Sequence, residues 1–211
     1  MRTGGASSGG FGFPPNAKLR LGFASEQEWS LLRDEKASVH DSADAAASIV
    51  MKCPSTTAKA AAQRLRSEIG HDARIVCILG GTAFRNGDSK ALVEAIAAKL
   101  GKLTDVKMKF VTGGMKGVQE AFAKSCGDGS RVWNLLPVGE SSGYGTGTDI
   151  NAGKDLDERK IIFGLLGDIY ISVEGGPGVS QEARTAYERG AAVVPLMRTG
   201  GASNGMYGFP P

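Results

Sequence analysis

The sequence predicts an α/β fold, in which a doubly wound, mostly parallel sheet carries helices on both of its faces. From Arg74 onward, apolar runs of strand length alternate with amphipathic segments of helical period. Three of these runs end directly in glycine-rich turns, a placement typical of strand-to-helix connections in such sheets. The chain of 211 residues is long enough for one domain of this kind and an additional segment.

Strands and helices follow one another in strict alternation, which is the pattern of βαβ units, and we expect five to seven strands. The expected strands that the apolar runs define are residues 75–79, 106–111, 132–136, 169–173 and 192–197. The helices between them are expected at about residues 88–100, 117–126, 154–166 and 179–189. Asp88 stands where it can cap the first helix, and the last strand is expected to run into Met197 without a break.

The chain is expected to divide into two regions. Residues 1–72 form an N-terminal glycine-rich segment with helices, which resembles the C-terminal end of a preceding repeat, and residues 73–211 form the α/β core. The helices expected in the first region are residues 26–34, 40–53 and 55–69. Ser55 is expected to cap the last of these, which is rich in alanine.

The two ends of the chain carry nearly the same segment. MRTGGASSGGFGFPP at residues 1–15 returns as MRTGGASNGMYGFPP at residues 197–211. The three pairs that differ are Ser8 and Asn204, Gly10 and Met206, and Phe11 and Tyr207. The chain is a fragment of a tandem array, a unit whose start has been moved along the repeat, or a chain with a duplicated tail of no consequence. Because each unit has room for one copy, we expect the C-terminal copy to lie beside the last strand and the N-terminal copy to be displaced.

Composition and charge exclude several classes of function. Lys and Arg number 25 and Asp and Glu 22, and this net charge of +3 with interspersed signs argues against nucleic-acid binding. No apolar run reaches the ~20 residues that cross a bilayer, so we expect no membrane contact. Cys53, Cys77 and Cys126 show neither a disulfide framework nor metal-ligand spacing. We therefore expect reduced thiols, no metal and a cytoplasmic protein.

Three glycine-rich turns are expected at one edge of the sheet, since the carboxyl ends of parallel strands lie together. They are Gly80-Gly81, Gly113-Gly114, and Gly175-Gly176 with Gly178. The backbone N–H groups of such turns converge, and the positive end of the following helix favours phosphate or carboxylate. One turn of this kind is usually a turn without a ligand, but three at one edge indicate a binding site.

Two charged residues are expected near this edge. Glu182 falls in the first turn of the helix that Gly178 opens, where it is either a functional carboxylate or an ordinary acid stabilised by the helix dipole. Arg159 follows Asp155 by four residues. This spacing favours either a surface ion pair or a fixed donor toward a ribose or phosphate.

Four motifs in a fixed order carry a resemblance to a known family: FVTGGMKGVQEA, LLPVGE, DLDERK and VEGGPGVSQEA. Over about residues 73–198 the chain resembles the Rossmann-like proteins called lysine decarboxylase-like, which include the cytokinin-activating LONELY GUY phosphoribohydrolases. The molybdenum cofactor carrier proteins share that fold. The resemblance implies a Rossmann-like fold that binds a nucleoside monophosphate. Nothing in the sequence indicates lysine decarboxylation.

The resemblance also implies roles for individual residues. Arg159 and Glu182 would act on the N-glycosidic bond, while a glycine loop holds the phosphate. Together with the first turn, the expected ligand-binding positions are Gly80, Gly81, Gly113, Gly114, Lys160, Gly175, Gly176, Gly178 and Val179. Three residues depart from the family pattern: Glu174 replaces a proline, Val179 a threonine and Thr112 a glycine. A carboxylate at Glu174 opposes a bound phosphate unless it faces away.

Three functions remain open at this point. The chain is a nucleotide-binding protein that acts as a nucleoside 5′-monophosphate phosphoribohydrolase, a non-catalytic carrier or sensor of a phosphorylated ligand, or a structural repeat whose site has decayed. We expect a small phosphorylated ligand and no cofactor. We also expect a homo-oligomer, since the resemblance implies a dimer and a single glycine-rich edge has few apolar walls of its own.

Overall fold

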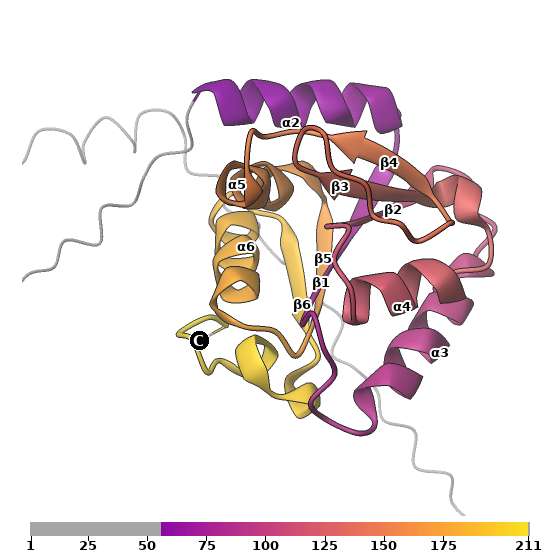
Figure 1. Ribbon diagram of the computed structural model, residues 1–211, viewed down its shortest axis with the longest axis vertical. Coiled ribbons are helices and arrows are strands. Elements are labelled where there is room, and N and C mark those ends of the chain that lie inside the picture. Colours follow the sequence, from indigo (N-terminus) through magenta and orange to yellow (C-terminus); the bar gives the residue numbers. More distant parts are fainter. Residues whose placement is uncertain (1–55, 211) are drawn as a thin grey trace, which may run out of the picture. The chain divides into compact units, whose positions relative to one another are not determined.

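A parallel sheet forms the centre of the protein, over the residues 56–210 that the computed structural model describes. Its strands are β1 (Arg74–Gly80), β2 (Met108–Thr112), β3 (Val132–Leu136), β4 (Thr148–Asn151), β5 (Ile169–Val173) and β6 (Ala192–Pro195). They lie in the order β4-β3-β2-β1-β5-β6, and every neighbouring pair is parallel (Figure 1). This topology confirms the doubly wound fold.

Helices cover both faces of the sheet (Figure 1). The helices are α2 (Thr56–Ile69), α3 (Ser89–Gly101), α4 (Val118–Ser125), α5 (Leu156–Leu166) and α6 (Pro177–Glu188). Alternate residues of β1 point to opposite faces of the sheet and so belong to two core clusters. Ile75, Cys77 and Leu79 pack with α2, α5 and α6. Val76 and Ile78 pack with α3 and α4 on the other face. A strand buried on both faces reads as a continuous apolar run, which is why β1 is evident from the sequence.

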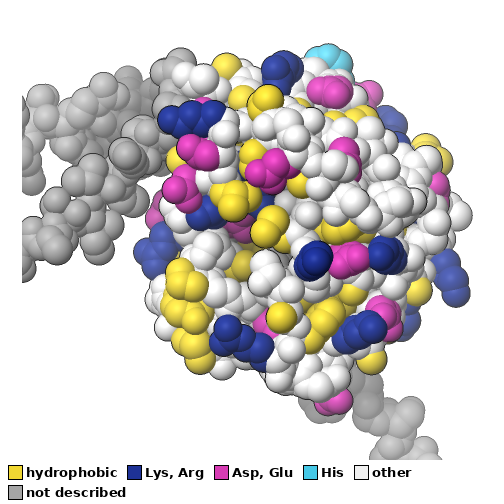
Figure 2. All heavy atoms as spheres, in the orientation of Figure 1, with side chains coloured by type: hydrophobic (Ala, Val, Ile, Leu, Met, Phe, Trp, Pro, Cys, Tyr) yellow, Lys and Arg dark blue, Asp and Glu magenta, His cyan; other side chains and the backbone are white. Residues whose placement is uncertain are grey.

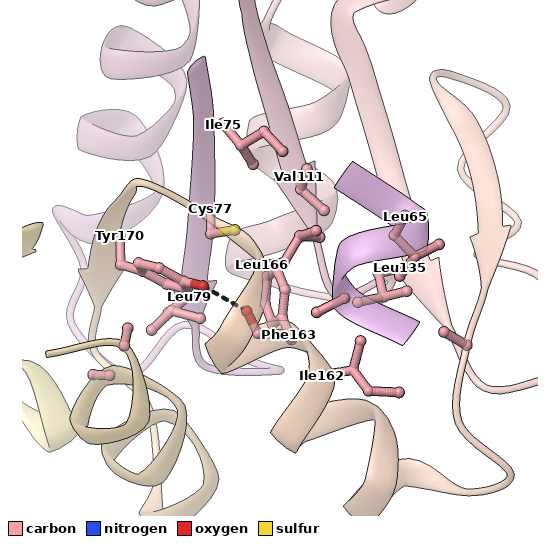
Figure 3. Packing of buried hydrophobic residues seen from close by; sticks show 14 of the residues in the cluster. Leu65, Ile75, Cys77, Leu79, Val111, Leu135, Ile162, Phe163, Leu166 and Tyr170 are labelled. Atoms are coloured by element: carbon pink, nitrogen blue, oxygen red, sulfur yellow. Dashed lines mark hydrogen bonds between the residues drawn. The ribbon is translucent and has the colours of Figure 1, made fainter. Parts of the chain in front are cut away.

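Tyr170 is a polar anchor within the larger core (Figure 3). Its hydroxyl donates to the Phe163 carbonyl at 2.6 Å and accepts from the Gly167 amide at 2.7 Å. Both bonds tie the end of α5 to β5, so the buried hydroxyl has the partners it needs. Beside it, burial raises the pKa of the Cys77 thiol well above its ordinary value. Cys77 therefore stays protonated and acts as a packing residue.

One strand was not expected from the sequence. β4 lies at the edge of the sheet and reads TDIN, with Ile150 as its one buried residue. Such a short strand of mostly polar residues has no apolar run by which it could be recognised. Its pairing with β3, from Trp133 opposite Thr148 to Leu136 opposite Asn151, completes the six strands.

Some expected boundaries were wrong. The run at 106–111 becomes a strand only at Met108, because the Asp105 side chain accepts from the Lys107 amide in a turn. The last strand ends at Pro195, and Met197 begins a 3-10 turn, η2 (Met197–Thr199), instead of continuing the strand. Asp88 stands at the N-cap of α3, but its side chain makes no capping hydrogen bond.

The C-terminal copy of the duplicated segment follows β6 directly and packs against β5 and α6. It contains η2 and a second 3-10 turn, η3 (Gly201–Asn204). Its N-terminal counterpart at 1–15 and the helices expected at 26–34 and 40–53 lie outside the described residues. No helix within residues 56–210 is long and apolar enough to cross a membrane.

Candidate functional site

The order of strands reverses between β1 and β5. From β1 the chain runs outward to β4 on one side, and β5 then returns to the other side of β1. The chain leaves these two strands toward opposite sides of the sheet. The crevice that forms at such a switch point is where doubly wound sheets bind ligands. The Gly81 amide donates to the Val173 carbonyl at 3.3 Å and so keeps the two turns together at the base of the crevice.

A cavity of about 250 Å³ occupies this switch point. Its walls are Gly81, Thr82, Ala83, Arg85, Glu174, Gly175, Gly176, Thr199, Gly201, Met206 and Tyr207. Three of the expected ligand-binding residues line it: Gly81, Gly175 and Gly176. The walls therefore come from the β1–α3 loop, the β5–α6 loop and the C-terminal segment.

Glu174 holds these three walls together. The residue is 3% exposed and its φ of 53° lies in the left-handed region, where a non-glycine residue is rare. The carboxylate accepts from the backbone amides of Arg85 at 2.9 Å and Asn86 at 3.1 Å in the β1–α3 loop. The carboxylate therefore faces that loop, and its charge is balanced by two N–H dipoles.

The C-terminal segment docks on the backbone of Glu174 and Gly175. The Glu174 amide donates to Thr199 Oγ1 at 2.8 Å, and the Ser203 amide and hydroxyl both donate to the Glu174 carbonyl at 3.0 Å. The Ala202 amide donates to the Gly175 carbonyl at 2.9 Å. These bonds fix the first part of the C-terminal copy, RTGGAS at residues 198–203, beside the cavity.

Helix α6 begins at the edge of the cavity. Gly176 is its N-cap and Pro177 its first residue, and no side chain of the described residues caps the backbone N–H groups of the first turn. Gly178 and Val179 follow as the second and third residues, whose N–H groups have no partner within a helix. The Val179 side chain itself packs in the core against Gly175. The first turn of α6 therefore presents positive N–H dipoles beside a glycine-lined cavity.

Arg159 and Glu182 form a buried ion pair. Arg159 Nη1 lies 2.8 Å from Glu182 Oε1, and the two residues are 3% and 4% exposed. Arg159 Nη2 donates to the Gly113 carbonyl at 2.9 Å. The surface pair of Arg159 with Asp155 was therefore the wrong alternative, because Asp155 instead caps α5 by accepting from the Glu158 amide. The pair links α5 and α6 to the end of β2.

The buried position of Glu182 raises the pKa of its carboxyl and so favours the neutral form. Burial raises the pKa of the Glu182 carboxyl to about 7, although the nearby Arg159 and Lys160 lower it. Arg159 Nε is buried without a hydrogen-bond partner among the described residues. A carboxyl with a pKa near neutrality can exchange a proton at physiological pH. Between residues 56 and 210, no three His, Cys, Asp or Glu side chains form a group that could hold a metal.

The remaining expected residues lie outside the lining of the cavity. A side chain on Gly80 would clash with Val118, and one on Gly114 would lie 2.5 Å from Leu136, so both glycines face packed side chains. Lys160 lies beside Gly178 at the start of α6, and its ammonium pairs with Asp157 at 2.7 Å. The structure thus separates the expected site into a cavity at the switch point and an ion pair beneath the neighbouring turn.

Most of the lining residues were not expected from the sequence as ligand contacts, and four of these are Arg85, Thr199, Met206 and Tyr207. Arg85 stands in a loop without a recognisable motif. The other three belong to the duplicated segment, and the duplication was the signal that could have directed attention to them. Their place on the wall depends on the two 3-10 turns, which the sequence pattern does not predict.

Comparisons with known proteins bear on the family and the fold of this chain. A model of the SLOG cluster4 family matches residues 73–206. Among solved structures, TM1055, a structural genomics target, has a TM-score of 0.52 at 25% sequence identity, covering 62% of this chain and 78% of its own. Two structures of the molybdenum cofactor carrier protein from Chlamydomonas reinhardtii have TM-scores of 0.45 and identities of 16% and 19%; the match covers 57% of this chain and 74% of theirs. No curated protein matches the chain.

The match to the family model includes all three glycine-rich turns, Arg159 and Glu182. It confirms the resemblance that the four motifs carry, and the likeness to TM1055 confirms the Rossmann-like fold. Because the family model spans more than half of the sequence, the chain belongs to the SLOG cluster4 family.

Proposed function

We propose that this protein binds a small nucleotide, a nucleoside 5′-monophosphate or a similar phosphorylated molecule, in the cavity at the switch point. The observation that carries the proposal is that Gly81, Gly175 and Gly176 line a cavity at which α6 begins without a side-chain cap. Backbone N–H groups without side chains around them allow a phosphate to approach closely, and the helix dipole favours its charge.

Glu174 is compatible with an anion at this position. Both of its carboxylate oxygens accept hydrogen bonds from backbone amides of the β1–α3 loop. These bonds leave the N–H groups at the start of α6 available to a ligand. Arg85, an exposed cation on the same loop, adds a positive charge at the cavity wall. These two features support phosphate binding despite the departure from the family pattern.

Gly176→Ala tests the proposal without disturbing the fold. A Cβ at Gly176 would meet no other atom within 4 Å, so the new methyl group occupies open space at the cavity wall. Gly87→Ala is the matched control, since Gly87 also has open space around it but does not line the cavity. Adenosine 5′-monophosphate and ribose 5-phosphate are titrated into each protein by calorimetry. We expect Gly176→Ala to weaken the binding of both ligands at least tenfold and Gly87→Ala to change neither.

Failure of the wild-type chain to bind either ligand would overturn the proposal. The same holds if Gly176→Ala binds both as tightly as the wild type, because the ligand then lies elsewhere.

Hydrolysis of the N-glycosidic bond is a second candidate, which the Arg159–Glu182 pair favours. Glu182 follows Gly178 by four residues, about one helical turn of ~5.4 Å. In this reaction the oxygen of water bonds to the ribose C1′, and the C1′–N bond breaks with its electron pair leaving on the base. Glu182 would take the proton from water and Arg159 would hold the sugar or phosphate.

The two candidates are separated by the products. Incubation with adenosine 5′-monophosphate should release adenine and ribose 5-phosphate if the protein is a hydrolase, and Glu182→Gln should abolish release while binding persists. Binding without release would identify a carrier or sensor. Absence of both would favour a structural repeat without a working site.

We also propose a homo-oligomer in a reducing, cytoplasmic compartment. Among the described residues Cys77 and Cys126 are free thiols. Tyr187, Val194 and Met197 are large apolar side chains that remain exposed. Figure 2 shows hydrophobic side chains gathered near the C-terminal end of the described chain, with charges of both signs around them. Sedimentation of a monomer of 21.9 kDa at micromolar concentration would contradict the assembly.

A further inference from the structure

The C-terminal segment presents two large side chains to the rim of the cavity. Met206 and Tyr207 are 66% and 39% exposed, and both line the cavity. The rest of the wall consists of small residues and the charged Arg85 and Glu174. The cavity therefore has a polar, backbone-rich interior and one apolar, partly aromatic side.

The backbone that carries this pair is fixed on both sides. The Met206 amide donates to the Gly201 carbonyl at 3.3 Å, and Ser180 Oγ donates to the Tyr207 carbonyl at 3.2 Å. Arg184 Nη2 donates to the Gly208 carbonyl at 2.7 Å, next to the buried Phe209. Two exposed apolar side chains thus project from a turn that is already ordered. A preformed rim lowers the entropic cost of binding a rigid ligand.

The size of the cavity leaves part of a nucleotide outside it. Its volume of about 250 Å³ lies below the ~300–1,000 Å³ of pockets that enclose drug-sized ligands. If the phosphate and sugar occupy the glycine-lined interior, the base must lie at the rim. Aromatic rings bind bases by stacking, and methionine thioethers pack favourably against ring edges.

We propose that Met206 and Tyr207 are the specificity-determining residues of this site and hold the planar base of the ligand, with the base stacked on the Tyr207 ring. This inference rests on the proposed nucleotide binding and deepens it, because it assigns the base-recognising wall to the C-terminal segment. A ligand that consists of a sugar phosphate alone makes no use of that wall.

The duplicated segment supports the assignment from the sequence. The first copy keeps the residues that anchor the segment, since Thr3, Ala6 and Ser7 match Thr199, Ala202 and Ser203. It differs at three positions, which in the C-terminal copy are all exposed, and two of these are Met206 and Tyr207. The residue matching Tyr207 is Phe11, so the aromatic ring is common to both copies and the hydroxyl is not.

The test compares a ligand that has a base with one that lacks it. Adenosine 5′-monophosphate and ribose 5-phosphate are titrated by calorimetry into the full chain and into Tyr207→Ala, Tyr207→Phe and Met206→Ala. Val138→Ala is the control for Met206→Ala, because Val138 is 68% exposed and lies outside the cavity lining. Circular dichroism of each variant checks that the fold is retained.

We expect Tyr207→Ala to weaken the binding of adenosine 5′-monophosphate about tenfold or more and to leave ribose 5-phosphate unchanged. Tyr207→Phe should stay within twofold of the wild type, Met206→Ala should lose a few-fold, and Val138→Ala should lose nothing.

Equal losses for both ligands in Tyr207→Ala would overturn the inference, because the residue would then support the wall without contacting a base. Unchanged affinity of Tyr207→Ala for adenosine 5′-monophosphate would overturn it too, while Gly176→Ala still reports on the proposed function. A wild-type chain that binds neither ligand overturns the proposed function and this inference with it.

Discussion

Arg159 on α5 forms an ion pair with Glu182 on α6, in which Nη1 lies 2.8 Å from Oε1 and both residues are buried. The same guanidinium donates to the carbonyl of Gly113 at the end of β2. One side chain therefore joins two helices and a strand beneath the glycine-rich edge. The Arg159–Glu182 pair therefore has a structural role in holding this edge of the sheet.

Removal of one partner of this pair should strongly destabilise the fold. At pH 8, where the Glu182 carboxyl is ionised, Glu182→Ala leaves the Arg159 charge buried and unpaired, which costs about 3–5 kcal/mol in the free energy of unfolding. Asp157→Ala is the control, because the Asp157–Lys160 pair is exposed and should change the free energy of unfolding little. Urea unfolding followed by circular dichroism measures both. Similar losses for the two variants would contradict a structural role of the buried pair.

The raised pKa of Glu182 makes stability depend on pH. Its value of about 7 in the folded protein exceeds the ordinary 4.5, so the folded state keeps a proton that the unfolded state loses between these values. The contribution is fully present below pH 4.5 and is lost as the pH rises through about 7. Urea unfolding of the wild type and Glu182→Gln at pH 5 and pH 8 measures it. We expect the stability of the wild type relative to the variant to fall from pH 5 to pH 8, and a constant difference would refute the shift.

Gly113 is required for close approach of the Arg159 side chain. A Cβ at this position would lie 2.8 Å from Nη2 and 2.9 Å from Nη1, and the paired guanidinium cannot move away without losing Glu182. Gly113→Ala should therefore cost about 1–3 kcal/mol of stability, as other overpacked positions do. Gly176→Ala serves as the comparison, since a methyl group there meets open space. Thermal unfolding in which both variants melt together would show that the guanidinium adapts.

The parts of the fold that the sequence predicted are those with strong local patterns. The runs at 132–136 and 169–173 became strands with these bounds because each is apolar and lies in the interior of the sheet. β4 has no such pattern, and its existence depends on pairing with β3. Local pattern therefore found the interior of the sheet but missed one edge.

The candidate site was predictable only in part, for a similar reason. Glycine-rich turns at strand ends mark the edge of the sheet in the sequence itself. The partnership of Arg159 with Glu182 is a contact between helices, and the sequence pattern offered Asp155 as the nearer partner. The orientation of Glu174 depends on a left-handed backbone and on amides 88 and 89 residues away. Neither relationship has a local signature.

Glu174 supplies the last prediction, because its carboxylate should hold the β1–α3 loop in place. The amides that donate hydrogen bonds to this carboxylate belong to Arg85 and Asn86, which are exposed. Water can therefore replace the carboxylate as the acceptor when the side chain is truncated. We therefore expect Glu174→Ala to change the global free energy of unfolding only modestly. Local order of the loop should be lost, since these two amides tie the loop to the β5–α6 turn.

Hydrogen exchange resolves this local effect, and a second variant separates the carboxylate from the backbone. Glu174→Ala keeps the left-handed strain, whereas Glu174→Gly relieves it by about 1–2 kcal/mol, and both lack the carboxylate. If the carboxylate orders the loop, the amides of Arg85 and Asn86 exchange rapidly in both variants, while the Gly81 amide, bonded to Val173, stays protected as an internal reference. Glu174→Gln, which retains one acceptor oxygen, should show intermediate protection. Slow exchange at Arg85 and Asn86 in Glu174→Ala would mean that other contacts order the loop, and the cavity wall would then not depend on this residue.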